Sequence, residues 1–249
     1  MDTLGIIFIL VKRDYALQFA GSFLGITWML IQNLSMILIY TLVFGLLQTR
    51  AGAHSANFSL PYVFSGLLFY FPLQEMLIRG CSILSDNRKL IKRSALGMEI
   101  FLWIPYFQML VHFLITSLPV FLYLYWLQGL KATFLLSYLF IPLAGLFIHS
   151  LLHYLARINV ILKDISPLVR LASQFLFWGL PILYYPSGIL KDLNRINPLN
   201  VPLDIFRLLV IKGYQLQFSW LQWTPFLLIA LMLFFLSRRR LNSVILDHL

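Results

Sequence analysis

The sequence has little charge. Only 11% of its 249 residues are Asp, Glu, Lys or Arg, whereas 60% are hydrophobic. An ordinary soluble domain carries roughly a quarter charged residues and has enough polar surface to face water. This chain does not, so we predict that lipid forms part of its solvent.

Cysteine is almost absent, since Cys81 is the only one. One cysteine excludes an internal disulfide, and without Cys or His partners at ligand spacing Cys81 is predicted to be an inert buried thiol. His149 and His153 lie four residues apart on one helix face and could hold a metal. No carboxylate is near them in sequence, however, and hydrogen bonding between helices is the simpler interpretation. We therefore predict no metal site in this chain.

Several catalytic motifs are also missing. The chain has no G-x-x-x-x-G-K-[ST] phosphate loop, no G-x-S-x-G nucleophile turn and no H-E-x-x-H zinc motif. Acidic residues inside apolar runs are nearly absent too, because Glu75 is the only one. A charge at the bilayer centre costs roughly 2.5–3.5 kcal/mol, and ion-coupled transporters usually keep such acids for their mechanism. If the protein drives transport, we expect another protein to supply the energy.

Long apolar runs are what the sequence does have. A membrane-spanning helix needs about 20 mostly apolar residues. Six segments meet or approach this length, and mid-membrane proline does not refute them because neighbouring helices can satisfy the freed carbonyl. We predict an all-α integral membrane protein whose six spans are Leu24–Leu47, Pro61–Ile78, Ile100–Leu127, Ala132–Ala156, Leu168–Tyr185 and Phe218–Ser237.

The basic residues predict the orientation. The net charge is +10, but the charges stand at the ends of apolar runs and form no basic stripe on a soluble domain, so we predict no nucleic-acid partner. Placing both termini in the cytoplasm puts 13 of the 19 Lys and Arg residues on that side and 6 outside. This asymmetry follows the positive-inside rule and agrees with an even number of spans.

Three connecting segments carry further information. Residues 1–20 are mildly amphipathic and too interrupted to span, so we expect an interfacial helix on the cytoplasmic surface. Residues 83–99 are the most charged internal stretch and predict a short cytoplasmic helix. Residues 186–217 form a long outer connection that contains the apolar Val201–Ile211, which is too short to span and predicts a re-entrant or interfacial element.

Short motifs along nearly the whole chain resemble one known family, the permease subunits of bacterial ABC-2 exporters, and most closely the branch that exports O-antigen, capsule or teichoic acid. In chain order the matching stretches are Gly21–Trp28, Ile39–Phe44, Pro61-Tyr62 with Ser65–Leu67, Asn87 to Lys92-Arg93 with Glu99, Asn159 with Lys163–Ile165, and Pro181–Tyr184 with Asn197-Pro198 and Arg207. Each motif is weak alone, but six in the right order form a strong signal.

The chain departs from the family pattern at four places. Gln18-Phe19 stands where an Arg-Tyr pair is common, Asn33 and Gly97 each replace a frequent proline, and Lys163 replaces an arginine. The Gln18 change weakens any assignment of lipid-phosphate binding to that position. The other three do not affect the predicted fold.

The resemblance implies a single ABC-2 type transmembrane domain over residues 1–249 that works as a homodimer with two copies of a cytoplasmic ATPase. ATP and Mg²⁺ would bind the ATPase, and this chain would hold no cofactor and no catalytic residue. The implied cargo is a long glycan on a polyprenyl pyrophosphate, and the implied location is a bacterial inner membrane, in contact with membrane lipids. Residues 83–99 would couple the two proteins through Asp86, Arg88, Lys89, Lys92, Arg93 and Glu99. The same basic residues could instead serve only as positive-inside anchors.

Aromatic residues make up 16% of the chain. Sugar rings stack their C–H faces on aromatics, and Tyr and Trp add hydrogen bonds, so a glycan channel would use such a surface. The alternative is that Trp and Tyr form interfacial belts and Phe faces lipid. The candidates for the channel lining are Tyr40, Phe44, Phe69, Tyr70, Phe71, Trp178, Tyr184 and Tyr185.

Lys12, Arg13 and Arg170 are predicted to lie near the cytoplasmic headgroups. There they could attract a lipid pyrophosphate or simply anionic lipid. We thus expect the membrane half of an exporter of lipid-linked polysaccharide such as O-antigen. Two alternatives stay open: an ABC-2 exporter of small lipids or drugs, and a membrane-embedded enzyme acting on polyprenyl-linked sugars.

Overall fold

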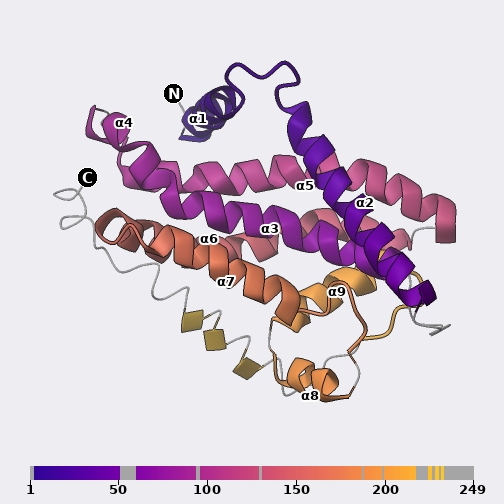
Figure 1. The fold of residues 1–249 in the computed structure, drawn as a ribbon. Helices are drawn as coiled ribbons and strands as arrows, with labels where there is room; N and C mark the ends of the chain where they lie inside the picture. The colour runs from indigo at the N-terminus through magenta and orange to yellow at the C-terminus, as the bar shows by residue number, and fades with distance from the viewer. Residues whose placement is uncertain are drawn as a thin grey trace.

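A computed structural model describes residues 3–50, 60–93, 96–128, 131–186, 188–197 and 199–216, and the pairs 224–225, 228–229 and 231–232. Across these residues all regular structure is helical, which confirms the predicted all-α class (Figure 1). The elements in chain order are α1 (Thr3–Gln18), α2 (Thr27–Arg50), α3 (Leu60–Asp86), α4 (Arg88–Arg93), α5 (Met98–Gln128), the 3₁₀ helix η1 (Ala132–Leu136), α6 (Ser137–Ile161), α7 (Ile165–Gly179), α8 (Ile189–Ile196) and α9 (Asn200–Val210).

Among the residues that the structure describes, three helical segments are long and apolar enough to cross a bilayer. They are Leu60–Asp86, Met98–Trp126 and Ala132–Ile161, and each exceeds the roughly 20 residues that a span needs. α2 runs for 24 residues and corresponds to the first predicted span. The sixth predicted span, Phe218–Ser237, lies mostly outside the described residues, so the count of six spans stays a prediction.

The fifth predicted span is only partly helical. α7 has 15 residues and is about 22 Å long, shorter than the roughly 30 Å hydrocarbon core. Its last turn gives way to an extended Leu180, because the following Pro181 disfavours the helical conformation at the residue before it. The chain then continues as buried, non-helical Leu180–Leu183.

The main core lies where α3, α5 and α6 pack side by side. Two glycines let these helices approach closely. A Cβ at Gly80 would collide with the Leu152 side chain, and one at Gly145 would collide with the Met109 side chain. Small residues at such crossings are typical of helix packing in membranes, where close backbone approach replaces the hydrophobic driving force.

A second cluster anchors α1 to one end of the bundle. Ile7, Leu10 and Val11 of α1 are buried against residues that include Leu84 of α3 and Phe101 of α5. Figure 1 shows α1 and α4 at this end, and α9 near the opposite end of α3. α1 therefore corresponds to the predicted interfacial segment, with one face attached to the helical bundle.

Two predicted connectors divide into smaller elements than the sequence pattern indicated. In residues 83–99, α3 extends to Asp86, α4 occupies residues 88–93 and α5 begins at Met98. The prediction of one short helix there was therefore too coarse; residues 94–95 lie outside the description. In residues 186–217 the structure has two short helices, α8 and α9, of which α9 covers most of the predicted apolar piece.

Candidate functional site

The α1 and α4 end of the bundle carries a small, strongly basic helix. α4 is held by Ile91, which is buried in the second cluster. Asn87 precedes α4, is itself buried, and its backbone carbonyl accepts hydrogen bonds from the backbone N–H groups of Leu90 and Ile91. The helix thereby presents exposed side chains outward, namely those of Arg88, Lys89, Lys92 and Arg93.

The remaining two predicted coupling residues are engaged within the chain. Asp86 is exposed and accepts a hydrogen bond of 2.7 Å from Ser82 Oγ. Glu99, at the start of α5, forms an ion pair with Arg157 of α6, and its carboxylate lies 3.3 Å from Nδ1 of His153 on the same helix. Glu99 therefore ties α5 to α6, which the sequence pattern did not reveal because its partners are more than 50 positions away.

The histidine pair lies beside this carboxylate. His153 Nε2 is 3.0 Å from His149 Nε2, and the His149 ring packs on Trp103. No group of three or more His, Cys, Asp or Glu side chains with metal-site geometry occurs in the described part of the chain. The His149–His153 contact lies within α6, and the His153–Glu99 contact is the one that joins two helices.

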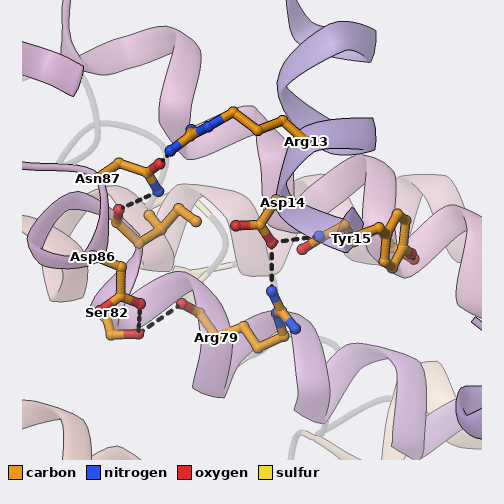
Figure 2. A network of polar contacts seen from close by, with 9 residues as sticks. Arg13, Asp14, Tyr15, Arg79, Ser82, Asp86 and Asn87 are labelled. Atoms are coloured by element: carbon orange, nitrogen blue, oxygen red, sulfur yellow. Dashed lines mark hydrogen bonds and ion pairs between the residues drawn. The ribbon is translucent and has the colours of Figure 1, made fainter. Parts of the chain in front are cut away.

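A polar network joins α1 to α3 and α5 (Figure 2). Asp14 Oδ2 forms an ion pair with Arg79 at 2.5 Å and accepts a hydrogen bond of 2.7 Å from Gln108 Nε2. Next to it, Tyr15 Oη donates to the Gln108 carbonyl at 3.3 Å. Burial raises the pKa of the Tyr15 hydroxyl, so Tyr15 acts here as a neutral donor.

The three residues predicted near the headgroups do not form one cluster. Arg13 Nη1 donates to Asn87 Oδ1 at 3.0 Å and thereby ties α1 to the turn before α4 (Figure 2). Lys12 on α1 and Arg170 on α7 are both exposed. Arg13 thus has a structural role, whereas Lys12 and Arg170 present exposed basic groups at the surface.

Three of the predicted aromatics meet around a residue that the sequence reasoning missed. The ring centroid of Phe177 on α7 lies 5.3 Å from that of Tyr40, 5.4 Å from that of Tyr70 and 6.2 Å from that of Phe71. Tyr70 also donates to the carbonyl of Ser173, one turn earlier on α7. This aromatic cluster (Tyr40, Tyr70, Phe71 and Phe177) therefore joins α2, α3 and α7.

The other predicted aromatics are dispersed. Phe69 points to another side of α3 and packs on Phe206, 5.5 Å away. Trp178 is exposed on α7, and its carbonyl accepts a hydrogen bond from Tyr184 Oη at 3.2 Å. Tyr185 lies at the α9 end of the molecule, where it stacks on Tyr62. The side chain of Phe44 lies outside the described residues.

At the α9 end a fully buried arginine holds several segments together. Arg207 donates to the carbonyls of Pro181 at 2.7 Å and Tyr62 at 3.3 Å, and its guanidinium lies 3.4 Å above the Tyr62 ring. Tyr62 stacks on Tyr185 at 4.0 Å. Cation–π contact and carbonyl dipoles together compensate the buried positive charge. Arg207 is thus a structural lock between α9, α3 and the segment after α7.

A tyrosine beyond α9 adds to this lock. Tyr214 Oη donates to Asp204 Oδ1 at 2.6 Å. Burial raises the pKa of the Tyr214 hydroxyl, which keeps it a proton donor at neutral pH. The stretch after α9 is thereby fixed to α9 itself.

A second polar contact lies inside the bundle. Glu75 of α3 pairs with Nδ1 of His112 on α5, and Nε2 of the same imidazole contacts Asn33 of α2. The one acidic residue predicted inside an apolar run is therefore partnered. This three-residue chain connects α2, α3 and α5 and explains how the membrane tolerates the carboxylate.

Comparison with known proteins identifies the family. Residues 6–211 match the family model of ABC-2 type transporters. The chain is also 27% identical, over 190 residues, to the O-antigen export system permease protein RfbA of Myxococcus xanthus, a match that covers 76% of this chain and 71% of that protein. The chain belongs to the ABC-2 type transporter family, as its motifs predicted, and is a membrane-embedded transport subunit.

Proposed function

We propose that this protein is the membrane-spanning subunit of an exporter that carries a lipid-linked polysaccharide, such as O-antigen on polyprenyl pyrophosphate, across a bacterial inner membrane. The observation that carries the proposal is the similarity, over 76% of the chain, to a protein named as an O-antigen export permease. Hydrolysis of ATP with Mg²⁺ takes place on a separate cytoplasmic ATPase, and two copies of this chain assemble with two copies of that ATPase.

The exposed face of α4 supports the ATPase partnership. Arg88, Lys89, Lys92 and Arg93 are exposed on a helix whose own anchor, Ile91, is buried. Charges presented on a rigidly held helix suit docking against a complementary partner, since charge complementarity fixes register and suppresses wrong partners. By the positive-inside count this end of the bundle faces the cytoplasm, where such an ATPase would be.

The aromatic cluster supports the glycan cargo. Tyr40, Tyr70, Phe71 and Phe177 gather on α2, α3 and α7, and the exposed Trp178 follows on α7. Aromatic faces stack on sugar C–H faces without demanding one particular sugar. If two copies face each other across α2 and α7, the half-buried Tyr40 and Phe71 and the exposed Trp178 border the path between them. The buried Tyr70 and Phe177 hold these rings in place.

Deletion of the gene in a bacterium that carries it tests the proposal. We expect the surface polysaccharide to disappear and the lipid-linked glycan to accumulate on the inner side of the membrane. The purified chain should hydrolyse ATP only together with its ATPase. Normal surface polysaccharide in the deletion strain, with a lipid or drug retained instead, would favour the small-molecule exporter and refute the glycan cargo.

A further inference from the structure

A polar cavity opens to the surface at the seam between α2, α3 and α5. It has a volume of about 420 Å³, within the range of roughly 300–1,000 Å³ that small-ligand sites occupy. Its wall is formed by Gln18, Phe19, Met29, Gln32, Asn33, Met36, Phe71, Gln74, Glu75, Ile78, Arg79 and His112. Seven of these twelve side chains are polar, in a chain that is 60% hydrophobic.

Packing alone does not explain all of these polar groups. Glu75, His112 and Asn33 satisfy one another, and Arg79 is paired with Asp14. The carboxamides of Gln18 and Gln32 are exposed at the cavity and make no hydrogen bond to any described residue. They are therefore available to a ligand.

The chemistry of the wall selects a neutral, hydroxyl-rich ligand. A carboxamide both donates and accepts, as a sugar hydroxyl requires, and Phe19 and Phe71 offer rings on which a sugar can stack. A phosphate would need unpaired Arg or Lys side chains. Here the single cation in the wall, Arg79, is already paired with Asp14, and Glu75 adds a negative charge.

The cavity ends where the same seam becomes apolar. On the next turns of α2, α3 and α5 the seam continues as a groove of about 640 Å³ whose wall includes Leu38, Leu42, Leu60, Phe64 and Val120. No hydrogen-bonding partner for a sugar hydroxyl follows in that wall apart from the Tyr123 hydroxyl. A sugar could therefore bind in the polar cavity but would not pass along the seam.

We propose that this polar cavity is a sugar-binding subsite at the α1 end of the bundle, where it holds one sugar unit of the glycan before the chain enters its conduit. The inference rests on the proposed function and adds to it the chemistry of recognition. The subsite is built by Gln18 and Gln32 as hydrogen-bonding groups, Glu75 as an acceptor, and Phe19 and Phe71 as stacking faces.

Cysteine labelling tests this subsite with the natural glycan. In a Cys81→Ser background, Gln32→Cys is labelled with a soluble maleimide in inverted membrane vesicles that contain the full complex and an ATPase unable to hydrolyse ATP. Vesicles from glycan-producing cells are compared with vesicles from a strain that cannot begin the glycan. Ile31→Cys is the matched control, because Ile31 is exposed on α2 and is not part of the cavity wall.

We expect the labelling rate of Gln32→Cys to fall several-fold when glycan is present, with Ile31→Cys unchanged. Equal labelling of Gln32→Cys in both vesicles, or an equal fall at both positions, would overturn the subsite. Inorganic pyrophosphate added to glycan-free vesicles should not protect Gln32→Cys, and protection by it would mean an anion site instead.

Export measurements separate this inference from the proposed function. The double variant Gln18→Leu/Gln32→Leu should fold normally, since neither carboxamide has a described partner, and should export glycan several-fold more slowly at unchanged protein abundance. Gln215→Leu, at an exposed position far along the chain, should export normally. If the deletion strain accumulates lipid-linked glycan inside the cell but the double variant exports glycan at the full rate, the proposed export function is supported and the sugar-binding subsite is refuted. If the deletion strain shows no glycan defect, the proposed function itself fails.

Discussion

Arg207 carries a full positive charge into the protein interior, and its neighbours are carbonyl oxygens and an aromatic face. The side chain is 0% exposed. A hydrogen bond to a charged group contributes about 1.5–3 kcal/mol to stability, and loss of the guanidinium would also leave the carbonyls of Tyr62 and Pro181 without this donor.

We expect Arg207→Met to lower the free energy of unfolding by about 3 kcal/mol. Thermal unfolding of the detergent-solubilised protein would measure this as a clear fall in Tm. Arg207→Lys should recover only part of the loss. An ammonium could replace the single Nη2 that donates to both carbonyls, but it lacks the planar guanidinium face that lies on the Tyr62 ring. Lys212→Met, at an exposed position, is the control. A wild-type Tm for Arg207→Met would show that the lock contributes nothing.

Phe177 is the centre of the aromatic cluster. Its side chain is buried between Tyr40, Tyr70 and Phe71. Truncation of a buried phenylalanine leaves a cavity and costs about 3–5 kcal/mol. We therefore expect Phe177→Ala to lower the Tm substantially. Phe175→Ala, two residues away and 71% exposed, should leave it nearly unchanged, and equal effects of the two variants would refute the assigned packing.

The roles of some residues could be predicted from the sequence, whereas the roles of others follow only from the fold. Buried Val169, Ser173 and Phe177 recur every four residues on α7, so a closer look at helical spacing could have found Phe177. No local pattern links Glu99 to Arg157, or Arg207 to the carbonyl of Pro181, because these contacts depend on how distant helices meet.

α1 is held against the bundle by apolar packing and by the Asp14–Arg79 ion pair. Replacement of Asp14 by Ala removes both that pair and the bond from Gln108. The lost charged hydrogen bonds are worth about 2 kcal/mol, and each 1.4 kcal/mol changes an equilibrium about tenfold. The population of detached α1 should rise accordingly.

Limited trypsin digestion of the solubilised protein measures this population, because cleavage of a transiently opened segment follows its equilibrium opening. We expect Asp14→Ala to be cut after Lys12 or Arg13 at least about tenfold faster than the wild-type protein. Asp86→Ala, which loses only a bond within α3, should be cut at the wild-type rate. Unchanged cleavage of Asp14→Ala would mean that apolar packing alone holds α1.

α4 is the element through which we expect the ATPase to act. The double variant Lys92→Glu/Arg93→Glu reverses two exposed charges and leaves the buried Ile91 anchor in place. If the facing surface of the ATPase is acidic, the variant places like charges against each other, which costs several kcal/mol of binding free energy. Export should therefore fall at least about tenfold while the Tm stays within about 1 °C, since exposed substitutions change stability little.

The matched control reverses the charge of two exposed lysines near α8 and α9, at the opposite end of the helical bundle from α4. Lys191→Glu/Lys212→Glu changes the net charge by the same amount. Export by this control should stay near the wild-type level. Full export by the α4 variant, or an equal loss in the control, would remove α4 from the coupling role.

The length of the apolar runs predicted that the helices exist. The residues at which the helices end depended on local features such as a following proline. α5 runs from Met98 to Gln128, within two residues of the predicted Ile100–Leu127. α7 stops at Gly179 because Pro181 constrains Leu180, a signal present in the sequence but not used for the predicted boundary. The split of residues 186–217 into α8 and α9 required tertiary contacts such as those of Arg207, which fix α9 in place.

In the described part of the molecule, α1 and α4 lie at one end of the helical bundle and α8 and α9 at the other (Figure 1). Charge asymmetry predicts which end faces the cytoplasm, but it cannot show whether α7, at about 22 Å, completes a crossing of a hydrocarbon core about 30 Å thick. If α7 crosses, the buried segment Leu180–Leu183 after it provides the additional length. Its apolar side chains are buried in the protein, and Arg207 satisfies the Pro181 carbonyl, so non-helical backbone is tolerated at that depth.

If α5, α6 and α7 with its extension each cross once, then α4 and α8 lie on opposite faces of the membrane. In a Cys81→Ser background, Lys89→Cys should react with an impermeant maleimide only in inverted vesicles, and Lys191→Cys only in intact spheroplasts. Both positions are exposed, so access depends on sidedness and not on burial. Labelling of both from the same face would mean that α7 turns back within the membrane, because an even number of crossings would then separate α4 from α8. Opposite labelling with Lys89→Cys outside would keep the crossings but reverse the orientation, and would place the basic helix α4 where no cytoplasmic ATPase could reach it.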